Sequence, residues 1–131
     1  MTLLTDESWS YDHSWPGATE NIHDAREFVG ARLDKHGLAA MADDVLLVVS
    51  ELVTNVVKHA PGPVDVVVLR TGDRVEVRIG DRSSALPVER TVDLSALTGR
   101  GLLIVAAYSI AWGVRPTVAG GKSVWAAFDV S

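Results

Sequence analysis

The most informative part of this sequence is an apolar run that carries a polar stripe, Ser50-Glu51-Leu52-Val53-Thr54-Asn55-Val56-Val57-Lys58-His59-Ala60. Its length, its four-residue repeats and the proline that follows it, Pro61, predict a helix rather than a strand. Glu51, Asn55 and His59 stand four residues apart, so they lie along one face of that helix. Lys58 lies beside the same face, and one side of an otherwise Leu/Val helix is therefore polar.

A carboxylate, an amide, an imidazole and an ammonium on one helix face suit a site for magnesium and phosphate. An amide oxygen and waters satisfy a hard cation. A nearby carboxylate can orient a nucleophile, and a lysine can neutralise phosphate. Taken alone, the spacing of Glu51 and Asn55 is more often a solvated stripe on a half-buried helix, and the rest of the chain changes that balance.

The composition favours one globular domain. The chain has 131 residues, enough for a single core over 1–131, and 47% of them are hydrophobic. The sequence has no cysteine, which excludes disulfides, thiol catalysis and cysteine metal sites. This composition is compatible with a reducing cytoplasm.

The N-terminal sequence and the net charge limit the expected location and the classes of binding partner. Residues 1–7 look like a ragged start and do not resemble a signal peptide, and no apolar run reaches membrane-spanning length. We therefore expect a cytoplasmic protein without a membrane partner. The net charge of −5 argues against nonspecific binding of nucleic acid, although a few local cations suffice for a nucleotide.

Periodicity predicts the order of the elements. Helices are expected at about 19–36, 39–60 and 102–109, and strands at 8–15, 64–70, 74–80, 112–117 and 123–130. The strands at 64–70 and 74–80 form a hairpin. This order predicts a two-layer α/β sandwich, with a mixed, mostly antiparallel sheet and helices on one face, and not a doubly wound fold.

Two segments of this order have open interpretations. The aromatic residues that alternate along 8–15 fit an edge strand or a dimer contact equally well. Residues 82–98 show little periodicity, and a loop of that length in a compact domain is usually a functional lid or disordered.

Three further clusters bear on a ligand. Asp81 follows a strand directly, where a carboxylate can accept a hydrogen bond from an exocyclic amine such as that of adenine. Gly99-Arg100-Gly101 precedes a helix, whose N-terminal N–H groups attract anions. Gly121-Lys122-Ser123 precedes the last strand. Each cluster alone is more often a turn.

Together these features resemble the ATPase domain of the GHKL superfamily, which has the Bergerat-type ATP-binding fold. The resemblance is closer to actinobacterial members of the anti-sigma-factor serine kinase branch, and it extends from Trp15 to Val130. It is carried by four motifs, Trp15-Pro16-Gly17, Val49-Ser50-Glu51-Leu52-Val53-Thr54-Asn55, Gly99-Arg100-Gly101-Leu102 and Lys122-Ser123-Val124-Trp125.

The resemblance implies roles for the helical stripe and the strand end. Asn55 would ligate a Mg²⁺ ion that bridges the ATP phosphates. Glu51 would be the catalytic residue that activates the attacking hydroxyl or water. Lys58 and His59 would lie near the nucleotide, and Asp81 would hold the adenine amino group.

The resemblance also implies roles nearer the C-terminus. Gly99, Arg100, Gly101 and Leu102 would close over the phosphates at the end of an ATP lid formed by 82–98. Ser123 would support Asp81 and a water bound to adenine.

The sequence departs from the family pattern at two places. The family's Asp-x-Gly-x-Gly is replaced by Asp81-Arg82-Ser83-Ser84-Ala85, which restricts the backbone there. The arginine that relatives carry just ahead of Gly99 is absent, and Arg90 and Arg100 are the alternatives. Kinase turnover is therefore a weaker expectation than ATP binding.

The expected function is an Mg-ATP-dependent protein serine/threonine kinase that regulates transcription. It would phosphorylate an anti-sigma-factor antagonist and sequester a sigma factor, acting as a homodimer through the N-terminal strand and first helix. A second hypothesis is a module that binds its partner without turnover, with or without ATP. A third is an interaction domain that binds no nucleotide.

Overall fold

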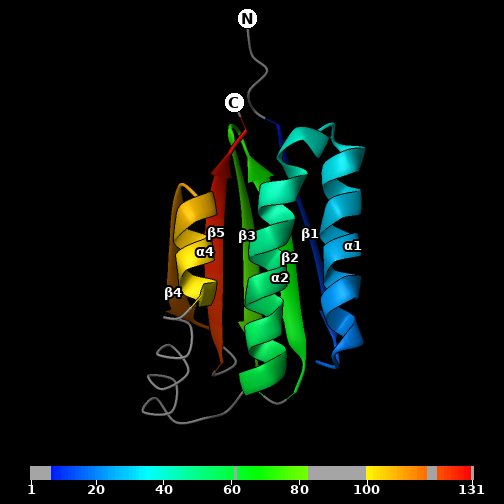
Figure 1. The fold of residues 1–131 in the computed structure, drawn as a ribbon. Coiled ribbons are helices and arrows are strands. Elements are labelled where there is room, and N and C mark those ends of the chain that lie inside the picture. The colour runs from blue at the N-terminus through cyan, green and yellow to red at the C-terminus, as the bar shows by residue number, and fades with distance from the viewer. Residues whose placement is uncertain (1–6, 61, 83–99, 118–120, 131) are drawn as a thin grey trace, which may run out of the picture.

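The computed structural model describes residues 7–60, 62–82, 100–117 and 121–130 (Figure 1). In chain order its elements are strand β1 (Ser8–Trp15), helix α1 (Glu20–Lys35), a 3₁₀ turn η2 (Ala39–Met41), helix α2 (Ala42–His59), strands β2 (Val64–Thr71) and β3 (Arg74–Asp81), helix α4 (Arg100–Tyr108), and strands β4 (Ala111–Pro116) and β5 (Lys122–Asp129).

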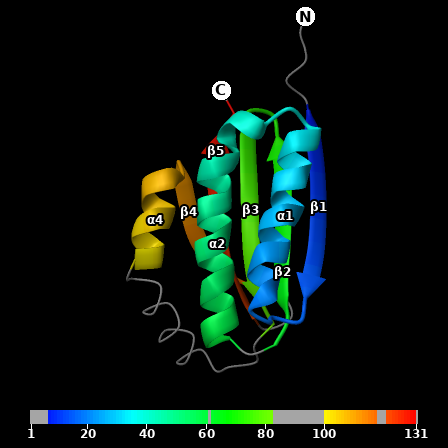
Figure 2. The same ribbon diagram turned by 45° about the vertical axis from the view of Figure 1, so that its right-hand side comes forward.

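The strands form one sheet in the order β1-β2-β3-β5-β4, and all four neighbouring pairs are antiparallel. The three helices lie side by side on one face of this sheet (Figures 1 and 2). The two-layer sandwich predicted from the sequence is confirmed, and the described strands contain no parallel pair.

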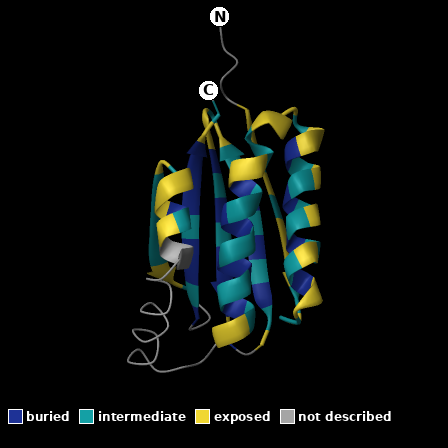
Figure 3. Ribbon diagram, in the orientation of Figure 1, coloured by how far each residue is buried: buried dark blue, intermediate teal, exposed yellow. Residues whose placement is uncertain are grey.

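The core lies between the layers because the strands alternate. On the helical side, β2 and β3 contribute a continuous row of buried apolar side chains, namely Val64, Val66, Val68, Val75, Val77 and Ile79. Helix α2 lies between α1 and α4 and buries Val45, Val48, Val49, Leu52, Val53 and Val56 against this row (Figure 3). Each such side chain stabilises the fold by about 1.5–3 kcal/mol.

The aromatic side chains of β1 pack within the monomer. The Trp9 ring stacks on His36 at 4.4 Å, and the Tyr11 hydroxyl lies 2.9 Å from His36 Nε2. Trp15 meets the Phe28 ring edge-on at 5.7 Å. Strand β1 is thus an edge strand covered by α1, and the homodimer stays a prediction.

Two boundaries differ from the sequence prediction in a way that affects the site. Strand β5 begins at Lys122, not Ser123, because Lys122 pairs with Pro116 of β4. Helix α4 begins at Arg100, two residues earlier than expected. Residues 83–98 of the predicted lid lie outside the described residues. Among the described helices, none is both long and apolar enough to cross a membrane.

Candidate functional site

The C-terminal half of α2 forms one wall of a cavity at the end of the sheet. Asn55 and His59, one turn apart, face this cavity together with the apolar residues Leu52, Val56 and Ala60. Glu51 is half-buried on the same helix, and Lys58 is exposed beside it. Neither Glu51 nor Lys58 lines the cavity.

The sheet forms the opposite wall and carries an acid. Val77, Ile79 and Asp81 alternate along β3, so all three point toward the helical layer. Ile79 and Asp81 line the cavity, and Asp81 is only 3% exposed. The structure therefore brings Asn55 and Asp81 to the same cavity, although they come from different layers.

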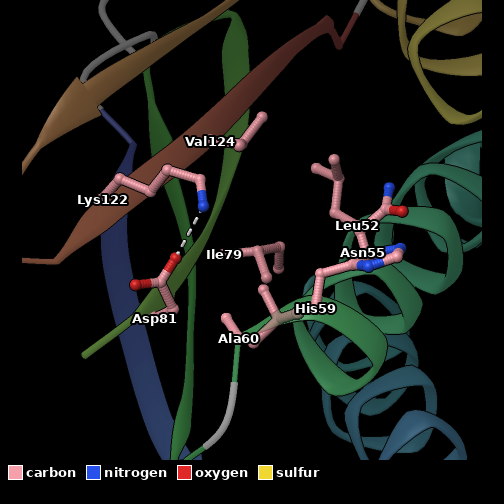
Figure 4. Close-up of a pocket in the computed structure, with 9 residues that line it drawn as sticks. Leu52, Asn55, His59, Ala60, Ile79, Asp81, Lys122 and Val124 are labelled. Atoms are coloured by element: carbon pink, nitrogen blue, oxygen red, sulfur yellow. Dashed lines mark hydrogen bonds and ion pairs between the residues drawn. The ribbon is translucent and has the colours of Figure 1, made fainter. Parts of the chain in front are cut away.

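Lys122, which the sequence analysis placed in a turn, also lines this cavity. Its Nζ atom lies 3.0 Å from Oδ2 of Asp81, and the two side chains are 12% and 2% exposed (Figure 4). The sequence did hold a signal for it. Lys122 shares the period-two spacing of Val124, Ala126 and Phe128, which face the helices.

Ser123 does not reach the cavity. It pairs with Gly80 of β3, and a Cβ atom built on Gly80 would lie 3.9 Å from that of Ser123 and 3.8 Å from that of Asp65. These positions share the face of the sheet that bears no helix. Because neighbouring strand residues point to opposite faces, the predicted support of Asp81 by the Ser123 side chain does not fit this arrangement.

The residues predicted to contact phosphate, 99–102, lie only partly within the described residues. Gly99 lies outside the described residues. Arg100, Gly101 and Leu102 form the first turn of α4, which packs against α2, but their side chains are not among those described. Their proposed contacts with phosphate remain predictions.

The cavity is small and mostly apolar in this state. Its volume is about 20 Å³, which accommodates about one water molecule. Its polar atoms come from Asn55, His59, Asp81 and Lys122, and the remaining lining is aliphatic. This lining suits a flat nucleobase, which would lie between the apolar walls and form hydrogen bonds with the polar groups at one end, provided that the cavity widens.

A second polar cluster fixes the chain next to Asp81. Arg82 donates to both carboxylate oxygens of Asp65, at 2.7 and 3.0 Å, and to the Ser14 hydroxyl at 3.0 Å. Ser14 in turn donates to Asp65. Burial raises the pKa of Asp65, but the hydrogen bonds from Arg82 and Ser14 and the Arg82 charge together lower it below its ordinary value.

Comparison with known families agrees with this site. A family model described as the histidine kinase-like ATPase domain matches residues 15–128, which include every residue of the cavity. The chain belongs to the histidine kinase-like ATPase domain family, and this membership supports ATP binding. None of the curated proteins matches the chain.

Proposed function

We propose that this protein is an ATP-dependent regulator of the anti-sigma-factor kinase type, which phosphorylates a serine of an anti-sigma-factor antagonist and binds a sigma factor. The observation that carries the proposal is the shared cavity of Asn55 and Asp81 in a chain of this ATPase family. Asn55 suits the phosphate end of a nucleotide, and Asp81 suits its nucleobase.

Asp81 would recognise the base. Its buried carboxylate is an acceptor for an exocyclic amine, and Ile79 and Val124 offer aliphatic surface to a flat ring. Neighbouring Ala60 adds a small side chain at the end of α2, so little bulk opposes the base on that side.

Asn55 would hold the metal ion. One amide oxygen from the protein fits Mg²⁺, which keeps several waters and takes its other ligands from phosphate. Among the described residues, no three His, Asp or Glu side chains converge on a point, so a dedicated all-protein cage is not the arrangement there. When bound, Mg²⁺ supplies charge neutralisation at the phosphates.

Glu51 would act as the general base of the reaction. It stands one turn before Asn55 on α2, so it lies toward the same end of the site. Its carboxylate would accept the proton of the partner's serine hydroxyl as the serine oxygen bonds to the terminal phosphorus and ADP leaves. Lys58, exposed on the same helix, would lie near the phosphates.

Phosphoryl transfer tests the proposal. ATP labelled on its terminal phosphate is incubated with the protein and antagonists encoded near its gene. We expect transfer to a serine, abolished by Glu51→Gln and retained by Glu27→Gln, an exposed acid on α1. Nucleotide binding without transfer to any antagonist would eliminate the kinase activity.

A binding module without turnover is the second candidate, because Lys122 already occupies the carboxylate of Asp81 and the family's glycines are missing after it. The two candidates differ in what Glu51→Ala does. A module binds its protein partner with unchanged affinity in this variant and shows no phosphorylation in either form. A kinase loses phosphorylation in the variant only.

A further inference from the structure

The contact between Lys122 and Asp81 occupies the group that the proposed function assigns to the base. The ammonium lies 3.0 Å from Oδ2, inside the cavity, and both side chains are almost fully buried. In Figure 4 the amine of Lys122 points at the carboxylate of Asp81, and Asn55 and His59 of α2 belong to the lining of the same cavity. Lys122 is therefore part of the base end of the site.

The backbone holds this contact in place. Gly80 pairs with Ser123 in the β3–β5 ladder, so the next residues along, Asp81 and Lys122, stand opposite each other on one face. The residue ahead of Lys122, Gly121, packs directly on the Asp81 backbone, so this segment lies close against β3.

The cavity leaves no room for a base beside this ion pair. Its volume accommodates about one water, so a purine reaches Asp81 only when the Lys122 side chain withdraws or the walls part. Withdrawal of Lys122 would exchange a charge-assisted hydrogen bond for one from a neutral amine, and the former is roughly twice as strong.

We propose that Lys122 is a specificity-determining residue that competes with the base amino group for the carboxylate of Asp81. The inference rests on the proposed nucleotide function and adds a consequence to it. Since the exocyclic amine of the nucleobase replaces Lys122 as the partner of the Asp81 carboxylate, it adds little net binding affinity. The protein therefore binds ATP only slightly more tightly than the same triphosphate without the exocyclic amine. Competition by Lys122 is the reason for this small difference in affinity.

The test compares ATP with purine riboside triphosphate, which lacks only the exocyclic amine. Dissociation constants with Mg²⁺ are measured by calorimetry for the unmodified protein, Lys122→Met and Lys122→Arg. A site built to accept a hydrogen bond from a donor group of its ligand can discriminate against analogues that lack this group by factors up to about 10⁴–10⁵. With Lys122 competing, we expect a preference for ATP below about tenfold, rising at least about tenfold further in Lys122→Met.

The controls separate charge from shape. Lys122→Arg keeps a cation that reaches Asp81, so the preference stays low. Lys35→Met makes the same exchange on α1, away from the cavity, and leaves the preference unchanged. Lys122→Gln replaces Lys122→Met if the latter does not fold, because its amide keeps a neutral partner for the carboxylate.

The outcomes distinguish this inference from the proposed function. A strong preference for ATP in the unmodified protein, or a preference that Lys122→Met leaves unchanged or lowers, overturns the competition while nucleotide binding stands. If neither triphosphate binds to any of the proteins, the proposed function and the inference fail together.

Discussion

Gly121 controls how closely the chain before β5 approaches Asp81. A Cβ atom at this position would lie 1.9 Å from the Asp81 carbonyl oxygen and 3.1 Å from Cα of Arg82. Both are backbone atoms, so they cannot move aside as a flexible side chain would. The position that orients Lys122 therefore requires a glycine, for reasons of space.

Gly121→Ala should lower the free energy of unfolding by about 1–3 kcal/mol, because β3 and the start of β5 must separate. Urea denaturation measures it. Gly30→Ala within α1 is the matched control, since a Cβ atom there would meet only the Leu46 side chain of α2, at 3.5 Å, and the substitution should stabilise the helix by about 0.5–1 kcal/mol. Equal effects of the two substitutions would contradict the close approach.

Asp65→Asn should lower the melting temperature at neutral pH. The pKa of Asp65 is depressed in the folded state, so its stabilising contribution is present at pH values above its ordinary 3.8 and is lost as the pH falls through the folded value. The effect should be a few degrees at most, because the pair is partly exposed. Thermal melts of both proteins from neutral to acid pH should converge; a constant difference would exclude this linkage.

At the scale of whole elements, the sequence predicts most of the fold. Period two along 8–15 and 74–80, and the long apolar run that precedes Pro61, identify β1, β3 and α2 with small errors at their ends. These patterns work because one face of each element is buried in a single core. The helix face carrying Asn55 follows from the same periodicity.

The start of β5 shows where local patterns fail. Gly121 and Lys122 are typical of a turn, and only pairing with Pro116 of β4 brings Lys122 into the strand. The sequence pattern therefore indicated Ser123 as the site residue, and a one-residue offset in a strand exchanges the two faces of the sheet. The period-two spacing that Lys122 shares with Val124, Ala126 and Phe128 is the signal for this extension of the strand, and the turn-forming residues beside it obscure that signal.

Leu52→Ala should destabilise the protein by about 2–5 kcal/mol, because Leu52 is 2% exposed and joins α2 to the core. Leu103→Ala, on the 70% exposed leucine of α4, should change stability by no more than about 0.5 kcal/mol. Denaturant midpoints compare the two variants. Similar losses would mean that α2 does not organise the core as described.

At the scale of the whole molecule, an acidic protein would bind an acidic ligand. The net charge of −5 disfavours anions in general, so binding depends on local cations. Lys58 and Lys122 lie at or beside the cavity wall formed by α2 and β5. The cavity is lined by α2 on one side and by β3 and β5 on the other, so a nucleotide bound there would contact the helical layer and the sheet together.

Mg-ATP should therefore raise the stability of the whole domain. A ligand at 100 times its dissociation constant stabilises the folded state by about 2.7 kcal/mol. Differential scanning fluorimetry should show a rise in melting temperature that chelation of Mg²⁺ reduces. Asn55→Ala should respond less to Mg²⁺; an undiminished response would remove Asn55 from the metal site.

Trp125 lies on the face of the sheet that bears no helix. A side chain at Gly113 of β4 would meet its indole at 2.8 Å, and the Arg115 guanidinium stands 5.1 Å from its ring. Its neighbour Val124 lines the cavity from the other side of the same strand. Indole fluorescence from this position would therefore record whether β5 itself bends when a ligand arrives, free of any direct quenching by that ligand.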